Sequence, residues 1–226
     1  LMKMGNILEM KLTHSPDTFE SMQQENVSPR EESQSLSYAY CQSGSLLVRS
    51  QIDCADRRLP KKTFDIKTRA TLPIRMDPTK YQQFLGYKLY SLFGLFNSFE
   101  REYFDMVRSA FLKYSFQVKL GNMDGIFVAF HNVFEMFGFQ YVSREEMDQI
   151  LFGNSVTGET SHQFLLRLFN LIMEHIVDIF PHSKEPFRVI FDVKKHKLMN
   201  IFVERYPPNT PFNANAIPIS LHQFTL

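Results

Sequence analysis

The sequence predicts a mixed α/β fold, in which a central β-sheet is flanked by helices. Pairs of short segments alternate between apolar and polar residues, as strands do, and long amphipathic segments with helical spacing separate these pairs. The predicted order is helix, two strands, helix, two strands, two helices and two strands. The chain has 226 residues, of which 44% are hydrophobic and 22% charged, which is ordinary for a globular protein.

The first third of the chain contains a predicted helix, a polar segment and two strands. Apolar residues at helical spacing predict a helix over residues 1–12, whereas residues 13–37 are polar and are predicted to form a loop insertion. Residues 45–53 and 63–72 alternate as strands do, and a turn that contains Pro60 joins them. We therefore expect these two strands to lie side by side.

The middle of the chain contains the clearest helical pattern. An apolar stripe runs from a capping residue, Ser98, to Gly121, where the helix is expected to end. Strands are predicted over residues 125–134 and 137–142. A capping box formed by Ser143 with Glu146 then predicts the start of a short helix.

The last part of the chain is predicted to contain a long helix and a hairpin. The apolar spacing over residues 161–179 predicts an amphipathic helix whose apolar stripe is buried. Residues 187–193 and 198–206 are predicted to pair as a hairpin across the basic turn 194–197. Residues 207–226 contain several prolines and are predicted to form an extended tail.

Composition excludes several classes of protein. The formal net charge is only +1, so any nucleic-acid contact must come from a local basic patch. Two cysteines, Cys41 and Cys54, are too few for a disulfide scaffold, and no Cys/His spacing predicts a zinc site. No apolar run predicts an integral membrane segment, and peripheral association with a membrane stays open. The first residues resemble neither a signal peptide nor a transit sequence, and we expect the chain to be a piece of a longer protein.

The two strands over residues 45–53 and 63–72 carry acidic residues that can converge. Asp65 and Lys67 are two positions apart, so their side chains project from the same face of a strand. Asp53 ends the preceding strand, and the turn between the strands would bring it alongside. Two converging carboxylates repel each other, and a Mg²⁺ or Mn²⁺ ion resolves that repulsion through oxygen ligands. We expect Lys67 to assist attack on a phosphodiester and the backbone carbonyl of Ile66 to add an oxygen ligand.

This arrangement of an aspartate followed by Asp-x-Lys resembles the PD-(D/E)xK (restriction-endonuclease-like) nuclease superfamily. In the branch that contains RecB and phage exonucleases, a glutamate on the first helix is a further metal ligand, and Glu9 matches that position. The sequence departs from the superfamily pattern because Ile rather than Pro precedes Asp53, and because the segment after Glu9 is long and polar.

Longer motifs resemble the petite-class mitochondrial RNA-processing and RNA-stability proteins of fungi and other lower eukaryotes. The resemblance covers about residues 5–153 and rests on four stretches: QIDCADRRLP, TFDIKTRA, FEREYFDMVRSAFLKYS and MDGIFVAFHN. It implies a mitochondrial protein that processes RNA 5′ ends, as a 5′-to-3′ exonuclease with a link to the mitochondrial RNA polymerase. We expect a nuclease-like domain over residues 1–206, followed by the tail.

Five polar residues are predicted to bind the substrate. Arg49 and Gln51 share the strand face of Asp53, and Arg69 continues the face of Asp65 and is suited to a scissile phosphate. In related nucleases the helix after the site carries polar residues that approach it. By that resemblance, Arg101 and Arg108 are expected to bind phosphate.

Each of these assignments has a simpler alternative. Asp65 and Lys67 could form an exposed ion pair. Asp53 could be an ordinary turn residue, and the nearby Asp56 is a competing candidate for the metal ligand. Arg101 has the spacing of an ordinary surface ion pair with Asp105.

Two alternatives to a ribonuclease also follow from the sequence. A catalytically inactive RNA-binding scaffold, associated with the mitochondrial RNA polymerase, would keep the fold without cleavage. A DNA nuclease would use the same metal chemistry, and contacts to the 2′-hydroxyl would distinguish it from a ribonuclease.

Overall fold

The computed structural model describes residues 7, 10–11, 14–24, 37–180, 187–193 and 199–205. Glu9, the basic turn 194–197, the tail 207–226 and most of the predicted first helix lie outside the described residues. The chain divides into two compact units, residues 1–170 and 171–226, and each is described by itself. Within the described residues, no helix is both long and apolar enough to cross a membrane.

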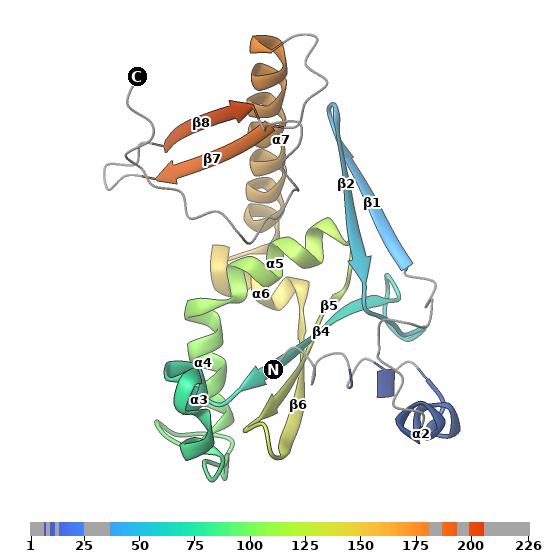
Figure 1. The fold of residues 1–226 in the computed structure, drawn as a ribbon, viewed down its shortest axis with the longest axis vertical. Coiled ribbons are helices and arrows are strands. Elements are labelled where there is room, and N and C mark those ends of the chain that lie inside the picture. Colours follow the sequence, from blue (N-terminus) through green and yellow to red (C-terminus); the bar gives the residue numbers. More distant parts are fainter. Residues whose placement is uncertain are drawn as a thin grey trace. The chain divides into compact units, whose positions relative to one another are not determined.

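The first unit is built on a four-stranded mixed sheet with the strand order β3-β4-β5-β6 (Figure 1). The strands are β3 (Cys54–Ala55), β4 (Thr63–Ala70), β5 (Gly125–His131) and β6 (Met136–Ser143). β4 and β5 are parallel, whereas the other two pairs are antiparallel. This arrangement confirms the predicted mixed α/β class and the two strands predicted in the middle of the chain.

The hairpin next to this sheet differs from the prediction. β2 (Leu46–Ile52) pairs along its whole length with β1 (Ser37–Ser43), not with β4. On the edge of β4 away from β5, the pairing strand is the two-residue β3, which begins just after Asp53. β1 was not predicted because its sequence, SYAYCQS, shows no clear apolar alternation and follows a polar segment.

A short helix occurs within the segment predicted to be a loop insertion, and two more follow β4. α2 (Pro16–Gln24) lies within the segment predicted to be a loop insertion, and residues 25–36 of that segment lie outside the description. α3 (Leu72–Met76) follows β4 directly, and a 3₁₀ helix, η1 (Pro78–Phe84), comes next. Pro73 and Pro78 stand in the first turns of these two helices, where the lack of an N–H is tolerated.

The single helix predicted from Ser98 to Gly121 is two helices, α4 (Phe99–Ser109) and α5 (Phe111–Leu120). Ser98 caps α4 as predicted, since its hydroxyl accepts a hydrogen bond of 3.1 Å from the backbone N–H of Arg101. The break lies at Ala110, whose φ of −131° is not helical. An apolar stripe continues across a break of one residue, so its spacing did not reveal two helices.

Two further helices follow β6. α6 (Arg144–Phe152) begins at Ser143, which accepts a hydrogen bond of 3.0 Å from the N–H of Glu146. The predicted capping box is only half formed, because the Glu146 carboxylate instead accepts a hydrogen bond from the Tyr103 hydroxyl. α7 (Ser155–Ile179) begins six residues earlier than predicted. Its apolar stripe is not buried as expected, since Phe164 is 68% exposed.

The second unit contains the predicted closing hairpin. β7 (Phe187–Val193) and β8 (Met199–Arg205) are antiparallel and pair over seven residues each. Phe187 pairs with Arg205 and Val193 with Met199. The prediction of a hairpin over this segment is therefore confirmed, whereas the turn that joins its strands lies outside the described residues.

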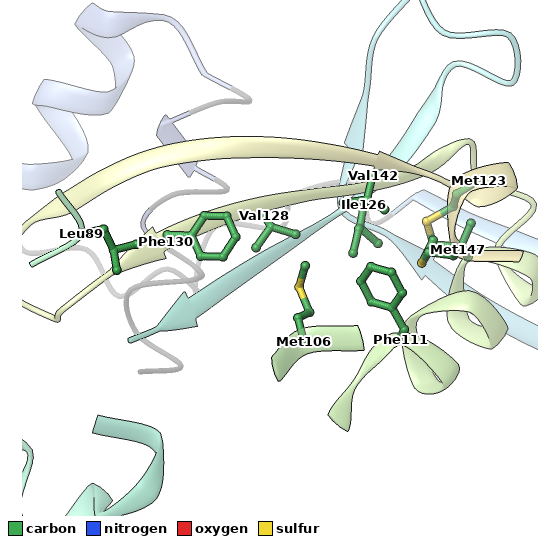
Figure 2. Packing of buried hydrophobic residues seen from close by; sticks show 10 residues of the cluster. Leu89, Met106, Phe111, Met123, Ile126, Val128, Phe130, Val142 and Met147 are labelled. Atoms are coloured by element: carbon green, nitrogen blue, oxygen red, sulfur yellow. The ribbon is translucent and has the colours of Figure 1, made fainter. Parts of the chain in front are cut away.

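The main core lies between the sheet and the helices α4, α5 and α6, as Figure 2 shows. Met106 and Phe111 point from the helices towards Ile126 and Val128 of β5, and all four side chains are fully buried. In the parallel register, Asp65, Lys67 and Arg69 of β4 stand opposite Ile126, Val128 and Phe130 of β5. The charged face of β4 therefore borders the core and lies under α4 and α5.

Candidate active site

Asp65 is the most unusual residue in the sheet. Its side chain is 1% exposed, and neither carboxylate oxygen accepts a hydrogen bond from the residues that the structure describes. Lys67 Nζ forms a close ion pair with Asp65 Oδ2. Burial is the main reason why the pKa of Asp65 is raised to about 7, and the neighbouring Asp53 carboxyl raises it further, against the effect of Lys67. Buried carboxylates usually have hydrogen-bond partners, so Oδ1, which Lys67 does not pair with, is available to a ligand.

Asp53 lies beside Asp65 because of a local irregularity in the sheet. It stands between β2 and β3, and its Oδ2 accepts a hydrogen bond of 3.3 Å from the backbone N–H of Ile66. β3 is too short to reach Ile66, so the Asp53 side chain takes the place of a strand partner there. The two carboxyl groups are close enough to share a hydrogen bond when Asp65 is protonated. The predicted convergence of Asp53 and Asp65 is therefore present.

Lys67 is held by α5 as well as by Asp65. Its Nζ donates a hydrogen bond of 3.0 Å to Gln117 Oε1 and lies 5.3 Å from the centroid of the Tyr114 ring. The lysine side chain is 17% exposed, so its ammonium group is largely shielded but still accessible. The carboxylate, amide and aromatic ring fix the position of this positive charge beside the two acids.

Arg69 continues the same face of β4 and is also buried, with 6% of its surface exposed. Its Nε and Nη2 have no hydrogen-bond partner, and Nε lies 4.0 Å from Glu102 Oε2. Glu102 is engaged elsewhere, because it accepts hydrogen bonds from the backbone of Leu72 and from Arg75. Burial and the Arg75 guanidinium lower the pKa of Arg69 to about 10, so it is still charged at neutral pH. Arg69 can therefore donate hydrogen bonds to an anion.

The carboxylate pair fits a divalent cation. The Asp65 carboxylate is buried and lies beside the Asp53 carboxylate, and carboxylate oxygens are the hard ligands that Mg²⁺ prefers. In the described part of the chain, no three His, Cys, Asp or Glu side chains gather as a possible metal site. Two carboxylates are nevertheless enough for Mg²⁺, which usually keeps several water ligands. The predicted ligands Glu9, which lies outside the described residues, and the Ile66 carbonyl stay predictions.

The other predicted substrate-binding residues lie apart from these contacts. Arg49 and Gln51 are on the exposed face of β2, where Arg49 stacks 4.5 Å from the centroid of the Tyr38 ring. Arg101 forms the alternative surface ion pair with Asp105, at 3.1 Å. Arg108 is exposed and stacks on Phe104, at 5.4 Å. Within the described residues, none of these four has a contact with Asp53, Asp65 or Lys67, and their role in binding stays a prediction.

Three residues of the site were not predicted from the sequence. Tyr114 lies within the apolar stripe of the helix, and Gln117 is a polar residue one turn after it. Glu102 lies in the first turn of the helix, where acids are common. Its position four residues before the buried Met106 would have indicated that it points inward.

Comparisons with known proteins give a consistent result. The family model described as "Mitochondrial protein Pet127" matches residues 1–174. The mitochondrial mRNA degradation protein pet127 of Schizosaccharomyces pombe is 47% identical over 154 residues, which cover 68% of this chain and 29% of that protein. PET127 of Saccharomyces cerevisiae is 47% identical over 123 residues, which cover 53% of this chain and 15% of that protein. The chain thus spans less than a third of the length of these relatives.

A solved structure is also similar. It is Scheffersomyces stipitis Rai1 in complex with (3′-NADP)⁺ and calcium ion, and the match covers 86% of this chain and 53% of that one. The TM-score is 0.44 and the sequence identity 13%, values at which the likeness carries no inference about fold or function.

Proposed function

This chain belongs to the Pet127 family of mitochondrial proteins, and we propose that it carries the catalytic site of a Mg²⁺-dependent ribonuclease of the PD-(D/E)xK type. The observation that carries the proposal is the buried Asp65 carboxylate, which has no hydrogen bond and lies beside Asp53 and Lys67. A scaffold that only binds RNA has no need for two converging carboxylates, one of them buried, next to an anionic ligand. The name of the S. pombe relative, an mRNA degradation protein, supports RNA as the substrate.

Each side chain of the site has a distinct task in this proposal. Asp53 and Asp65 would hold Mg²⁺. When bound, Mg²⁺ would lower the pKa of a water ligand and polarise a phosphoryl oxygen. Lys67, fixed by Gln117, would orient the attacking water and offset negative charge that develops at the phosphorus. Arg69 would donate hydrogen bonds from its free Nε and Nη2 to a phosphate oxygen.

The charges around Arg69 support a phosphate-binding role. Three arginines, Arg69, Arg75 and Arg101, lie with two carboxylates, Glu102 and Asp105, in one network of ion pairs. This network keeps one positive charge that its own members do not neutralise. A phosphate group of the substrate would supply the missing negative charge.

The direct test is cleavage of RNA. We expect the 226-residue chain to release nucleotides from single-stranded RNA with a 5′-phosphate in the presence of Mg²⁺, and to degrade it from the 5′ end. Asp65→Asn should lower the rate by a factor on the order of 100 or more, because it removes a negative ligand. Asp56→Asn is the matched control, because Asp56 lies in the nearby turn and pairs with Arg58.

The outcomes separate the ribonuclease from its alternatives. Equal cleavage by the wild-type chain and Asp65→Asn would refute the catalytic assignment. Binding of RNA without cleavage would indicate the scaffold, which in the sequence-based alternative is associated with the mitochondrial RNA polymerase. Equal cleavage of DNA and RNA of the same sequence would indicate a nuclease that does not recognise the 2′-hydroxyl.

A further inference from the structure

A cavity of about 410 Å³ lies in the first unit, lined by residues of β1, α5, α6 and α7. It shares no residue with the carboxylate site. On α5, Tyr114 and Gln117 contact Lys67, whereas Ser115 and Lys119 contact Asp148 of α6. Because residues two positions apart on a helix point in nearly opposite directions, Gln117 and Lys119 face different sides of α5. The helix therefore separates the cavity from the carboxylate site.

The wall of the cavity carries positive charge that its own carboxylates do not fully neutralise. Lys119 is neutralised by Asp148, at 2.8 Å. Arg144 lies 3.6 Å from Glu159 Oε2, which is longer than a hydrogen bond, so its donors are still available. Arg167 is exposed, and among the described residues its side chain has no ion pair or hydrogen bond. Two guanidinium groups therefore line the cavity with free donors.

Two buried polar atoms at the cavity also lack a hydrogen-bond partner among the described residues. His162 is 6% exposed and its ring lies 5.7 Å from the Phe116 ring, but its Nε2 has no hydrogen bond. Burial lowers the pKa of His162, which keeps the ring neutral and able to donate one hydrogen bond. Glu159 Oε2 likewise has no hydrogen-bond partner and can only accept. A buried polar group without a partner costs about 1–3 kcal/mol, so a ligand that satisfies both atoms would be favoured.

The ligand must therefore offer both negative oxygens and a hydroxyl donor. A phosphate group would accept hydrogen bonds from Arg144, Arg167 and His162, and a ribose hydroxyl would donate to Glu159. Tyr40 lines the same cavity and is 62% exposed, so its ring is available for stacking on a base. The volume lies within the range of roughly 300–1,000 Å³ that is common for small-molecule sites.

We propose that this cavity is a second nucleotide-binding site, which takes a ribose-phosphate unit either from an RNA strand or from a free ribonucleotide. It does not depend on catalysis at the carboxylate pair, and it can be tested without Mg²⁺. A nucleotide held here would lie on the other side of α5 from the cleavage site. In a strand, it would be a nucleotide other than the one being cleaved.

Binding measurements in EDTA test the proposal, because Mg²⁺ is then absent and RNA is not cleaved. The probes are AMP and inorganic phosphate, followed by calorimetry, and a fluorescent ten-nucleotide RNA, followed by anisotropy. Arg144→Gln and Arg167→Gln should each weaken binding of a nucleotide about tenfold, because each removes one charge-assisted hydrogen bond. The logarithm of the RNA binding constant falls with the logarithm of the salt concentration, and each variant should make that slope shallower by about 0.7.

Two further variants make the result specific. Lys80→Gln removes an exposed positive charge whose one ion pair within the described part of the chain is with Asp77, and it should leave binding unchanged. Glu159→Ala should weaken AMP binding while phosphate binding stays the same or improves, because only AMP carries the ribose hydroxyl. Thermal melting of each variant checks that the fold is kept.

The outcomes decide between two sources of the nucleotide. If Arg144→Gln and Arg167→Gln weaken binding of both AMP and RNA, the cavity takes free nucleotides as well as a strand. If they weaken RNA binding alone, the nucleotide belongs to a strand. If they bind both probes as tightly as the wild-type chain does, the proposal is wrong, whatever the result of the cleavage test.

Discussion

The Asp65 carboxylate is a buried acid whose charged neighbours are one lysine and one further acid. Its neighbours provide one positive charge, from Lys67, and one further negative group, from Asp53. Neither of its oxygens accepts a hydrogen bond, and its pKa is raised to about 7. A divalent cation would supply the missing charge, which is the physical reason to expect one between these two acids.

Gln117 gives a prediction about catalysis at this scale. Gln117→Ala removes the hydrogen bond that holds Lys67 Nζ, so we expect a mobile lysine and a fall in kcat of about tenfold. The affinity for Mg²⁺ should change little, because Gln117 does not contact Asp53 or Asp65. Steady-state cleavage assays and Mg²⁺ titrations measure the two effects separately. Lys113→Ala, an exposed change on the same helix, is the control, and an equal loss there would contradict the role of Gln117.

His131 gives a prediction about stability. It is fully buried, and burial lowers its pKa to about 4, against 6.5 for the free side chain. Between these values the unfolded chain binds the proton and the folded chain does not, so stability falls as the pH falls from 6.5 towards 4. From pH 7 to pH 5 this loss should be about 2 kcal/mol.

Urea unfolding at the two pH values measures this loss. His131→Asn keeps an acceptor for the Val133 N–H, to which His131 Nδ1 is now bonded at 3.0 Å, but the asparagine does not titrate. Between pH 7 and pH 5, the free energy of unfolding of this variant should therefore fall by about 2 kcal/mol less than that of the wild-type chain. A pH dependence equal to that of the wild-type chain would show that His131 is not the group responsible.

At the scale of elements, α5 connects the sheet to the next helix through polar side chains on two of its faces. One face holds Lys67 of β4 through Gln117, and the other holds Asp148 of α6 through Lys119. Both members of the Lys119–Asp148 pair are almost completely buried. Such a pair adds little net stability compared with apolar residues, but leaving one member alone is very unfavourable.

Removing one member of this pair should therefore destabilise the fold more than removing both. Lys119→Met should lower the free energy of unfolding by about 3–5 kcal/mol, and Lys119→Met with Asp148→Asn should restore most of it. Lys88→Met, which breaks the exposed pair with Glu135, should cost less than about 1 kcal/mol. Denaturant unfolding measures all three, and a double variant as unstable as the single one would contradict this account of the pair.

The elements that the sequence predicted well are those with a local cause. Capping by Ser98 and Ser143 marked the starts of α4 and α6, and alternating residues marked β4 and β5. The errors have non-local causes. The partner of β2 is chosen by tertiary packing, and the break at Ala110 leaves the apolar stripe intact.

The site was predictable to the extent that it follows strand geometry. The two-residue period of β4 placed Asp65, Lys67 and Arg69 on one face, as the structure has them. Asp53 converges by a different route, through the backbone of Ile66 rather than from a full-length neighbouring strand. Gln117 and Tyr114 come from a distant helix, and which face of that helix meets β4 is decided by packing that no local pattern records.

At the scale of the whole molecule, all described residues of the carboxylate site lie in the unit formed by residues 1–170. The match to the family model, over residues 1–174, covers nearly the same part of the chain. The family is mitochondrial, which confirms the location inferred from the sequence motifs. The relatives are more than three times as long as the segments that match this chain.

Calorimetric titration of Mg²⁺ into the metal-free chain at pH 8 tests the central claim most directly, because Asp65 is then ionised. The wild-type chain and Asp56→Asn should both bind Mg²⁺ with the same affinity, and Asp65→Asn should show no binding heat in the same range. If Asp65→Asn bound Mg²⁺ as tightly as the wild-type chain does, the Asp53 and Asp65 carboxylates would not form a metal site.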